Sequence, residues 1–107
     1  MLAMDNDMTP AVAIHPGFVL KEELESRNIT QKKFAEIIGM PYTQLNEVLN
    51  EKRPMPADMA LAVEAALDII AYIWVKLQAD YTLQVAREDK SMRTRMENIR
   101  KICASLL

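Results

Sequence analysis

The sequence predicts an all-α fold. Its 107 residues include only two glycines, and the frequent residues Ala, Leu, Met, Glu and Lys favour helices. Apolar residues recur at spacings of three and four, which is the period of a helix face. A chain of this length is expected to form one domain with a modest core.

The first helix is expected to begin after His15-Pro16-Gly17 and to end near Arg27. Leu20 and Leu24 form an i, i+4 apolar pair that should face the core. Residues 1–13 contain three methionines and a proline without usable periodicity, so we expect a flexible N-terminal extension there.

Residues 30–46 predict two short helices joined by a tight turn, at about 31–38 and 42–50. Thr30 is a suitable N-cap because its hydroxyl can accept from an exposed amide of the first turn. Gly39 can take the positive φ needed where a helix stops. Pro41 suits the first turn of the next helix. This arrangement is typical of a helix-turn-helix, whose second helix presents polar groups to a DNA groove.

The remaining chain predicts three more helices. Two prolines make residues 50–56 a loop, and a helix follows from about 57 or 58 to 67. Its small and apolar residues are expected to allow close packing; they are Leu61, Ala62, Ala65 and Ala66. A further helix should run from about 70 to 87, with a break at 88–90, and Ser91 is the expected cap of the last helix.

The last helix carries an apolar stripe with heptad-like spacing on a charged surface. Its members are Met92, Met96, Ile99, Cys103 and Leu106. The stripe has three possible roles, which are packing on its own domain, joining two subunits and binding another protein. The expected organisation is thus an extension at 1–13, a DNA-binding domain at 14–86 and a C-terminal amphipathic helix at 87–107.

The distribution of charge along the chain favours a nucleic-acid partner more than the net charge does. The net charge is −2 overall, but residues 30–53 carry +1 and residues 87–107 carry +3, while residues 1–29 and 54–86 carry −3 each. A monomer of this charge would hold DNA weakly, so we expect a homodimer that doubles the phosphate contacts.

Several function classes are excluded by what the sequence lacks. No apolar run approaches the ~20 residues of a membrane span, and the acidic start is unlike a signal peptide. The single cysteine suits a reducing cytoplasm. His15 has no partners at metal spacing and should cap or pack locally. We expect no enzyme activity, cofactor, metal or small-molecule substrate.

The exposed side of the helix at 42–50 carries the candidate base-reading residues. Asn can bind adenine through two hydrogen bonds, and Thr can contact a base edge or a thymine methyl group. The candidates for base reading are Tyr42, Thr43, Asn46 and Glu47. The candidates for phosphate binding are Gln31, Lys32, Gln44, Asn50, Lys52 and Arg53. The alternative is an ordinary solvated helix surface. Trp74 is expected in the core or in a contact with a second subunit or with another protein.

Four blocks of sequence resemble the HigA/VapI-type antitoxins of the Xre/Cro-like helix-turn-helix family. They are HPG at 15–17, LNEVLNEKR at 45–53, ALA at 60–62 and WVKLQADY at 74–81. The resemblance implies a lambda-repressor-like five-helix domain, here with an additional C-terminal helix, and a homodimer on a palindromic operator. It also implies repression of a promoter and neutralisation of a toxin, commonly a RelE-like mRNA endonuclease.

This chain departs from the family pattern at three positions. Phe18 stands where an acidic residue is usual, and the family often has glycine at the site of Glu51 and near Asp68. These departures concern the helix ends, and two other functions also stay open. One is a stand-alone transcriptional regulator without a toxin, and the other is a protein-binding scaffold whose helix-turn-helix no longer holds DNA.

Overall fold

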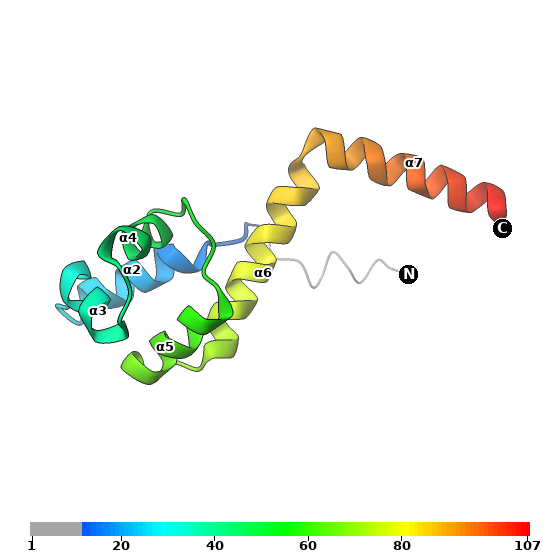
Figure 1. Cartoon of the computed structure of the whole chain (residues 1–107). Helices are drawn as coiled ribbons and strands as arrows, with labels where there is room; N and C mark the ends of the chain where they lie inside the picture. The colour runs from blue at the N-terminus through cyan, green and yellow to red at the C-terminus, as the bar shows by residue number, and fades with distance from the viewer. Residues whose placement is uncertain (1–11) are drawn as a thin grey trace.

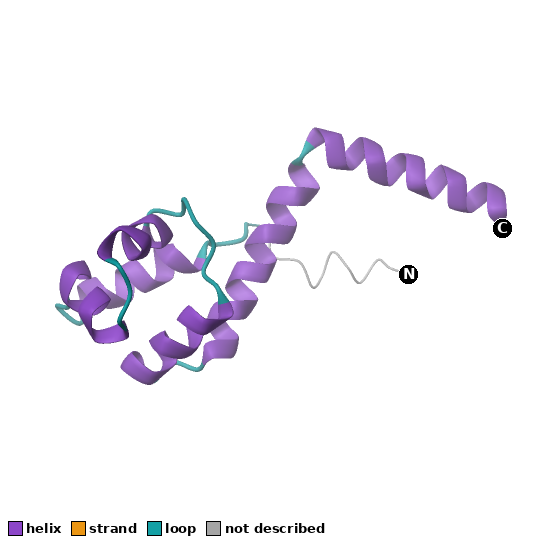
Figure 2. Cartoon of the chain, viewed as in Figure 1, coloured by secondary structure: helices purple, strands orange, loops and turns teal. Residues whose placement is uncertain are grey.

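The computed structural model describes residues 12–107, which form helices joined by short loops (Figures 1 and 2). The helices are α2 (Pro16–Ser26), α3 (Gln31–Ile38), α4 (Tyr42–Leu49), α5 (Ala57–Leu67), α6 (Ala71–Glu88) and α7 (Lys90–Leu106). The all-α prediction is confirmed. None of the helices in this part of the chain is long and apolar enough to cross a bilayer. Residues 1–11 of the expected extension lie outside the described range, and Ala13 already donates its backbone N–H to Gln84 on α6.

One core joins α2 to α6 and holds α4 in place. Its largest fully buried side chains include Trp74 from α6 and Phe34 from α3. The other members are Leu20, Leu24, Ala35, Leu45, Val48, Leu49, Met55, Met59, Ala60, Val63 and Leu67. Trp74 is 1% exposed, so of the places expected for it the structure shows the core. The indole fills the space between α6 and the other helices.

The start of α2 packs directly on the end of α4. A Cβ atom on Gly17 would lie 1.9 Å from the backbone oxygen of Val48, so this approach requires glycine. The His15 side chain caps the helix, since its Nδ1 accepts from the Gly17 backbone N–H at 2.9 Å. The helix therefore begins at Pro16 rather than after Gly17 as predicted. Proline is tolerated there because a first-turn N–H needs no intrahelical acceptor.

The predicted helix-turn-helix is confirmed to within a residue. Thr30 Oγ1 accepts from the Lys33 backbone N–H at 3.1 Å, and Gly39 ends α3 with a φ of 68°. Pro41 lies at the N-cap of α4, one position before the first turn in which we expected it. Its ψ of 136° is extended rather than helical, so α4 begins at the next residue, Tyr42.

Three helices end on left-handed residues other than glycine. Asn28, Glu51 and Asp68 have φ values of 57°, 63° and 60°. The glycines that the family often has near two of these positions are therefore not required for the helix ends. Each such residue costs about 1–2 kcal/mol relative to a right-handed conformation, and the packing of the flanking helices offsets that cost.

The prediction for the packing face of α5 was wrong. Leu61 is 60% exposed, and Ala65 and Ala66 are exposed as well. The buried face instead consists of Met59, Ala60, Val63 and Leu67. Nearly every position of α5 is apolar, so its sequence does not distinguish one face from another by periodicity.

The last helix extends away from the rest of the molecule as an arm (Figure 1). Asp89 caps it by accepting from the Met92 backbone N–H at 3.1 Å, in place of the predicted Ser91. The helix has no buried residue, and the chain measures 57 × 26 × 21 Å as a result. Met92 and Met96 are half-buried, while Ile99, Cys103 and Leu106 are exposed. The part of the stripe from Ile99 onward is thus not covered by its own domain.

Candidate nucleic-acid interface

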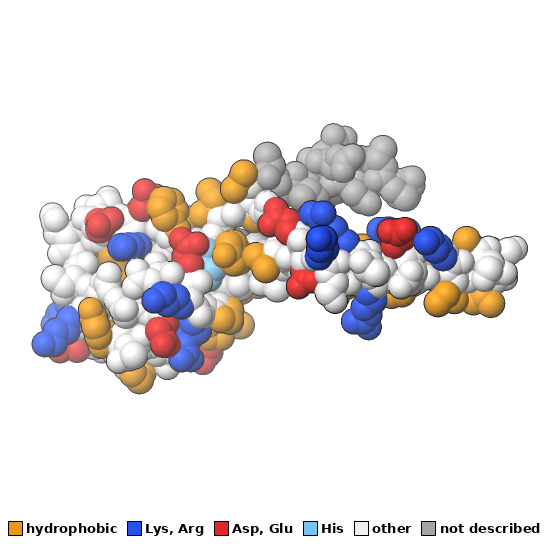
Figure 3. Space-filling view, turned by 90° about the horizontal axis from the view of Figure 1, so that it is seen from above, with side chains coloured by type: hydrophobic (Ala, Val, Ile, Leu, Met, Phe, Trp, Pro, Cys, Tyr) orange, Lys and Arg blue, Asp and Glu red, His pale blue; other side chains and the backbone are white. Residues whose placement is uncertain are grey.

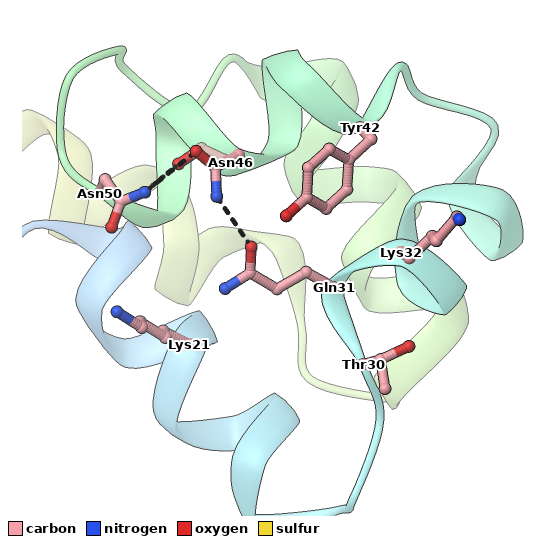
Figure 4. A pocket seen from close by; sticks show the side chains of 7 residues that line it. All are labelled: Lys21, Thr30, Gln31, Lys32, Tyr42, Asn46 and Asn50. Carbon is pink, nitrogen blue, oxygen red and sulfur yellow. Dashed lines mark hydrogen bonds between the residues drawn. The ribbon is translucent and has the colours of Figure 1, made fainter.

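A polar hollow of about 800 Å³ opens where α2, α3 and α4 meet. Its walls come from the middle of α2, the N-terminus of α3 and one side of α4 (Figure 4). The lining residues are Lys21, Thr30, Gln31, Lys32, Tyr42, Asn46 and Asn50. Five of these seven residues had been predicted as DNA contacts from the sequence alone, and the fold brings them together on one surface.

Side-chain amides connect α3 and α4 across this polar hollow. Asn46 Nδ2 donates to Gln31 Oε1 at 3.0 Å. Asn50 Nδ2 donates to Asn46 Oδ1 at 3.1 Å and to the Asn46 backbone oxygen at 3.0 Å. The three amides therefore form a continuous hydrogen-bonded network, whose two bonds between side chains are drawn in Figure 4.

The electrostatics of this surface favour an anion. Thr30 satisfies one amide at the start of α3, and the other first-turn amides have no acceptor within the helix. The positive end of the helix dipole points the same way. Lys32 on α3 and Lys21 on α2 add two cationic side chains to the rim.

The two predicted DNA contacts Glu47 and Arg53 bind each other. Arg53 Nη2 lies 2.7 Å from Glu47 Oε1, and Arg53 Nε donates to the same oxygen at 2.9 Å. This pair connects α4 to the loop that follows it. A base contact by Glu47 would therefore require the guanidinium to move or to share the carboxylate.

Four other predicted residues lie apart from the amide network. Gln44 is half-buried on another side of α4, where it lines a small hollow with Asp58. Thr43 is exposed in the first turn of α4 and does not line the polar hollow. Lys52 and Arg53 lie in the loop after α4, where they line a second hollow with His15.

Lys21 lines the polar hollow but was not among the residues predicted from the sequence. It is half-buried and is the one basic residue of α2, whose other charged residues are all glutamates. The sequence feature that could have identified it is a single basic residue, next to the apolar Leu20, in an otherwise acidic helix. The sequence does not show that this side of α2 faces the amides of α4.

His15 supports the loop that carries Lys52 and Arg53. The imidazole is 3% exposed, and its ring packs edge-on against Tyr81 of α6 with 4.8 Å between the centroids. Burial lowers the pKa of His15, and the nearby Glu51 carboxylate and the Arg53 backbone oppose that effect. The predicted local role of His15 in capping and packing is confirmed.

The arm carries the other concentration of positive charge. In Figure 3, Lys and Arg side chains crowd α7, and hydrophobic side chains gather near its C-terminal end. An ion pair joins Lys101 to Glu97 at 3.4 Å. No group of three His, Cys, Asp or Glu residues between 12 and 107 is arranged to hold a metal ion.

Comparison with known proteins agrees with this architecture. The helix-turn-helix family profile matches residues 20–71. Virulence-associated protein I of Dichelobacter nodosus is 33% identical over 79 residues, which is 73% of each chain.

Two solved structures are similar over most of their length. The Pseudomonas aeruginosa antitoxin HigA with the higBA promoter has a TM-score of 0.73 and 29% identity, covering 80% of this chain and 95% of that one. An addiction module antidote protein of the HigA family from Coxiella burnetii has a TM-score of 0.71 and 28% identity, covering 80% and 92%. The chain therefore belongs to the Xre-like helix-turn-helix family, in the group that includes HigA-type antitoxins and VapI-like virulence-associated proteins.

Proposed function

We propose that this protein is a sequence-specific DNA-binding transcriptional repressor that acts as the antitoxin of a HigBA-type toxin–antitoxin operon. The observation that carries the proposal is the polar hollow that joins the first turns of α4 to the N-terminus of α3. It combines amide groups that can read base edges with cations and helix amides that can hold phosphate. The promoter bound to the Pseudomonas HigA protein supports the same use of a similar fold.

In this proposal α4 enters the major groove with its N-terminal half toward the bases. Tyr42, Thr43 and Asn46 face base edges. Gln31, Lys32 and Lys21 hold the adjacent phosphates at the start of α3, and Asn50 lies at the far end of the same surface. Lys52 and Arg53 extend the phosphate contacts beyond the end of α4.

We further propose that the active unit is a homodimer. One subunit offers few cations for phosphate contacts, and its total charge is −2. Two subunits on adjacent half-sites would double the contacts and therefore the salt dependence of binding. The apolar stripe of α7 is open to a second copy or to a toxin.

The antitoxin role is supported by the relatives, which include proteins described as an antitoxin and as an addiction module antidote. The test is to co-express the chain with the product of the neighbouring reading frame and to measure growth and co-purification. Growth arrest that this chain relieves, together with a stable complex, is the expected result. The stand-alone regulator is favoured if the neighbouring product is harmless and does not bind.

DNA binding itself is tested on the protein's own promoter fragment. Thr43→Ala and Asn46→Ala should each weaken specific binding by about 5- to 150-fold, the range for loss of a good base contact, and added salt should weaken it further. Thr94→Ala and Asn98→Ala on α7 are matched controls and should leave affinity unchanged. Equal affinity of all four variants would show that α4 does not read the bases.

A further inference from the structure

We infer that the arm α7 of one chain lies in an apolar groove between α3 and α5 of a second copy, so that two chains exchange their arms. The groove consists of two adjoining hollows, and Ile38 and Ala62 line both of them. This inference rests on the proposed homodimer and names the two surfaces that would form it.

The groove between α3 and α5 is apolar and open to solvent. Its first hollow has a volume of about 290 Å³ and is lined by Ile37, Ile38, Ala62, Ala65 and Ala66. The second hollow, of about 220 Å³, continues past Ile38 to the turn at Gly39 and Pro41. Ile37 is 53% exposed at the edge of the groove. An exposed apolar surface of this kind is typical of a protein contact.

The alanines of α5 leave room in the groove for another helix. Ala62, Ala65 and Ala66 are among the residues whose sequence predicted close packing, together with Leu61. None of them belongs to the hydrophobic core formed by residues 12–107. Their short side chains therefore remain available for a close contact with a second chain.

The arm α7 offers an apolar surface that matches the groove. Ile99, Cys103 and Leu106 are exposed members of its stripe, and the exposed Ile102 widens that stripe. These four positions follow the spacing i, i+3, i+4 and i+7, by which an amphipathic helix occupies an apolar groove. The arm has 17 residues and α5 has 11, so the arm is long enough to span the groove.

The arginines beside the stripe disfavour the pairing of α7 with another α7. Arg93, Arg95 and Arg100 flank the apolar positions, where the e and g residues of a coiled coil meet across the interface. A parallel pair would place Arg95 opposite Arg100 of the other helix. An antiparallel pair would place Arg93 and Arg100 along one shared edge. Because like charges at these positions repel, the arm is better suited to a surface with acidic residues.

The groove carries acidic residues around its apolar centre. Asp58 lines its second hollow, Glu36 is exposed beside Ile37, and Asp68 is exposed at the end of α5. Lys33 offsets one of these charges through an ion pair with Glu36 at 3.9 Å. The arm has five cationic side chains against one glutamate. The charges of the two surfaces are therefore complementary.

The arm that occupies the groove has to come from another chain. In Figure 1, α7 leaves the end of α6 and points away from α3 and α5. An arm of a second copy has no such restriction. A symmetric exchange forms the same contact twice, as expected of a homodimer with a two-fold axis. It would cover the exposed stripes and the grooves of both chains together.

The experiment is disulfide cross-linking of the full-length protein, because Cys103 is the one cysteine of the chain and lies in the stripe. A chain with Cys103→Ser and either Ala62→Cys or Ala66→Cys is co-expressed with the wild-type chain and oxidised. These two positions lie one turn apart in the groove. At least one of them should form a disulfide with Cys103 of the wild-type chain, and the position that does so reports the direction of the arm.

Ala79→Cys with Cys103→Ser is the matched control for cross-linking. Ala79 is an exposed alanine on α6 and lies outside the groove. It should form no disulfide with Cys103 under the same conditions. A cross-link from Ala79→Cys and none from the groove would place the arm elsewhere and overturn the inference.

A change of charge in the groove tests the contact without a cross-link. Ala66→Arg places a cation where the basic arm would lie, and the exposed position should tolerate it. Dimerisation measured by sedimentation equilibrium should weaken by about tenfold or more, because like charges then meet at the contact. Ala79→Arg should leave the dimerisation constant unchanged. Thermal unfolding establishes that both variants are folded.

The inference and the proposed homodimer fail in different ways. If the wild-type protein is a monomer, the proposed homodimer is wrong and the inference falls with it. If a dimer forms but neither groove position cross-links to Cys103, or Ala66→Arg dimerises like the wild type, the inference alone is overturned. A wild-type disulfide between two Cys103 residues would show α7 pairing with α7 and would also overturn it. Binding of the promoter fragment is measured separately.

Discussion

Two residues at the start of α2 hold the end of α4 in place. Gly17 admits the backbone oxygen of Val48 at a distance that no side chain would allow. His15 caps the same turn and packs against Tyr81 on α6. Small changes at either residue are therefore expected to affect stability and, through α4, the proposed DNA-binding surface.

Gly17→Ala should destabilise the fold by about 1–3 kcal/mol or more, because the new methyl group meets backbone atoms rather than a flexible side chain. Gly39→Ala is the informative control. Its Cβ would meet nothing within 4 Å, and its positive φ should cost only about 1–2 kcal/mol. Chemical denaturation measures the loss of stability in both variants. A smaller loss for Gly17→Ala than for Gly39→Ala would contradict the close contact between α2 and α4.

His15 should make stability depend on pH. Its pKa in the folded state is lowered from 6.5, so below that pH the unfolded chain takes up a proton that the folded chain resists. The stability that the neutral His15 side chain contributes is fully present above about pH 6.5. It is lost as the pH falls from there toward the lowered pKa. Thermal unfolding between pH 7.5 and 5.5 should show a falling midpoint. This range isolates the one histidine of the chain.

His15→Asn is the control for this effect. Asparagine is a good N-cap, so the Gly17 N–H retains an acceptor while the titrating group disappears. The variant should show a flatter pH dependence than the wild type. A wild-type slope preserved in His15→Asn would assign the effect to other groups.

Helices α3 and α4 were predictable because their limits are set by local chemistry. Thr30 caps α3 and Gly39 ends it, and both roles can be recognised from a few neighbouring residues. The buried face of α5 was not predictable, since its apolar residues surround the helix. The left-handed end at Asp68 was also missed, because packing imposes that conformation on a residue that does not favour it.

The residues of the candidate site likewise divide into those that local sequence identifies and those that tertiary packing positions. Gln31, Asn46 and Asn50 were identified because the helix-turn-helix pattern places them on one exposed surface. Lys21 was not predicted to lie on that surface, and Gln44 lines a different hollow, because the positions of both depend on how α2 and α5 pack around α4. The ion pair between Glu47 and Arg53 likewise depends on the path of the loop after α4.

The contribution of α2 to DNA binding is tested at Lys21. Lys21→Ala should reduce the slope of log affinity against log salt by about 0.9 for each subunit, since one phosphate contact is lost. The sequence preference should stay as in the wild type, because a phosphate contact carries no base information. Lys101→Ala on the arm is the matched control. Equal slopes for the wild type and Lys21→Ala would remove Lys21 from the interface.

Residues 12–107 form a helical body and a protruding arm with different energetic roles. The body contains every buried residue of the hydrophobic core, and α7 contributes none. Most of the stability of a protein helix comes from packing of its amphipathic face, so the apolar stripe of α7 is expected to be stabilised by a partner. The arm should thus be important for assembly and nearly neutral for folding of the body.

Removal of residues 90–107 tests this division of roles. The free energy of unfolding of the body should change by less than about 0.5 kcal/mol, as for surface changes in general. Analytical ultracentrifugation should show a smaller assembly, or loss of the toxin complex where the neighbouring product binds. Unchanged assembly in both measurements would show that the stripe serves neither partner.

The arm and the polar hollow lie at opposite ends of an elongated body (Figure 1). A protein seated on α7 would leave the duplex-facing side of α4 sterically open, so both ligands can occupy one chain at the same time. Competition for a shared surface is then not the means by which one ligand displaces the other. Any influence between them would travel along α6, whose first turn carries the buried indole of Trp74, to the helices that hold the amides.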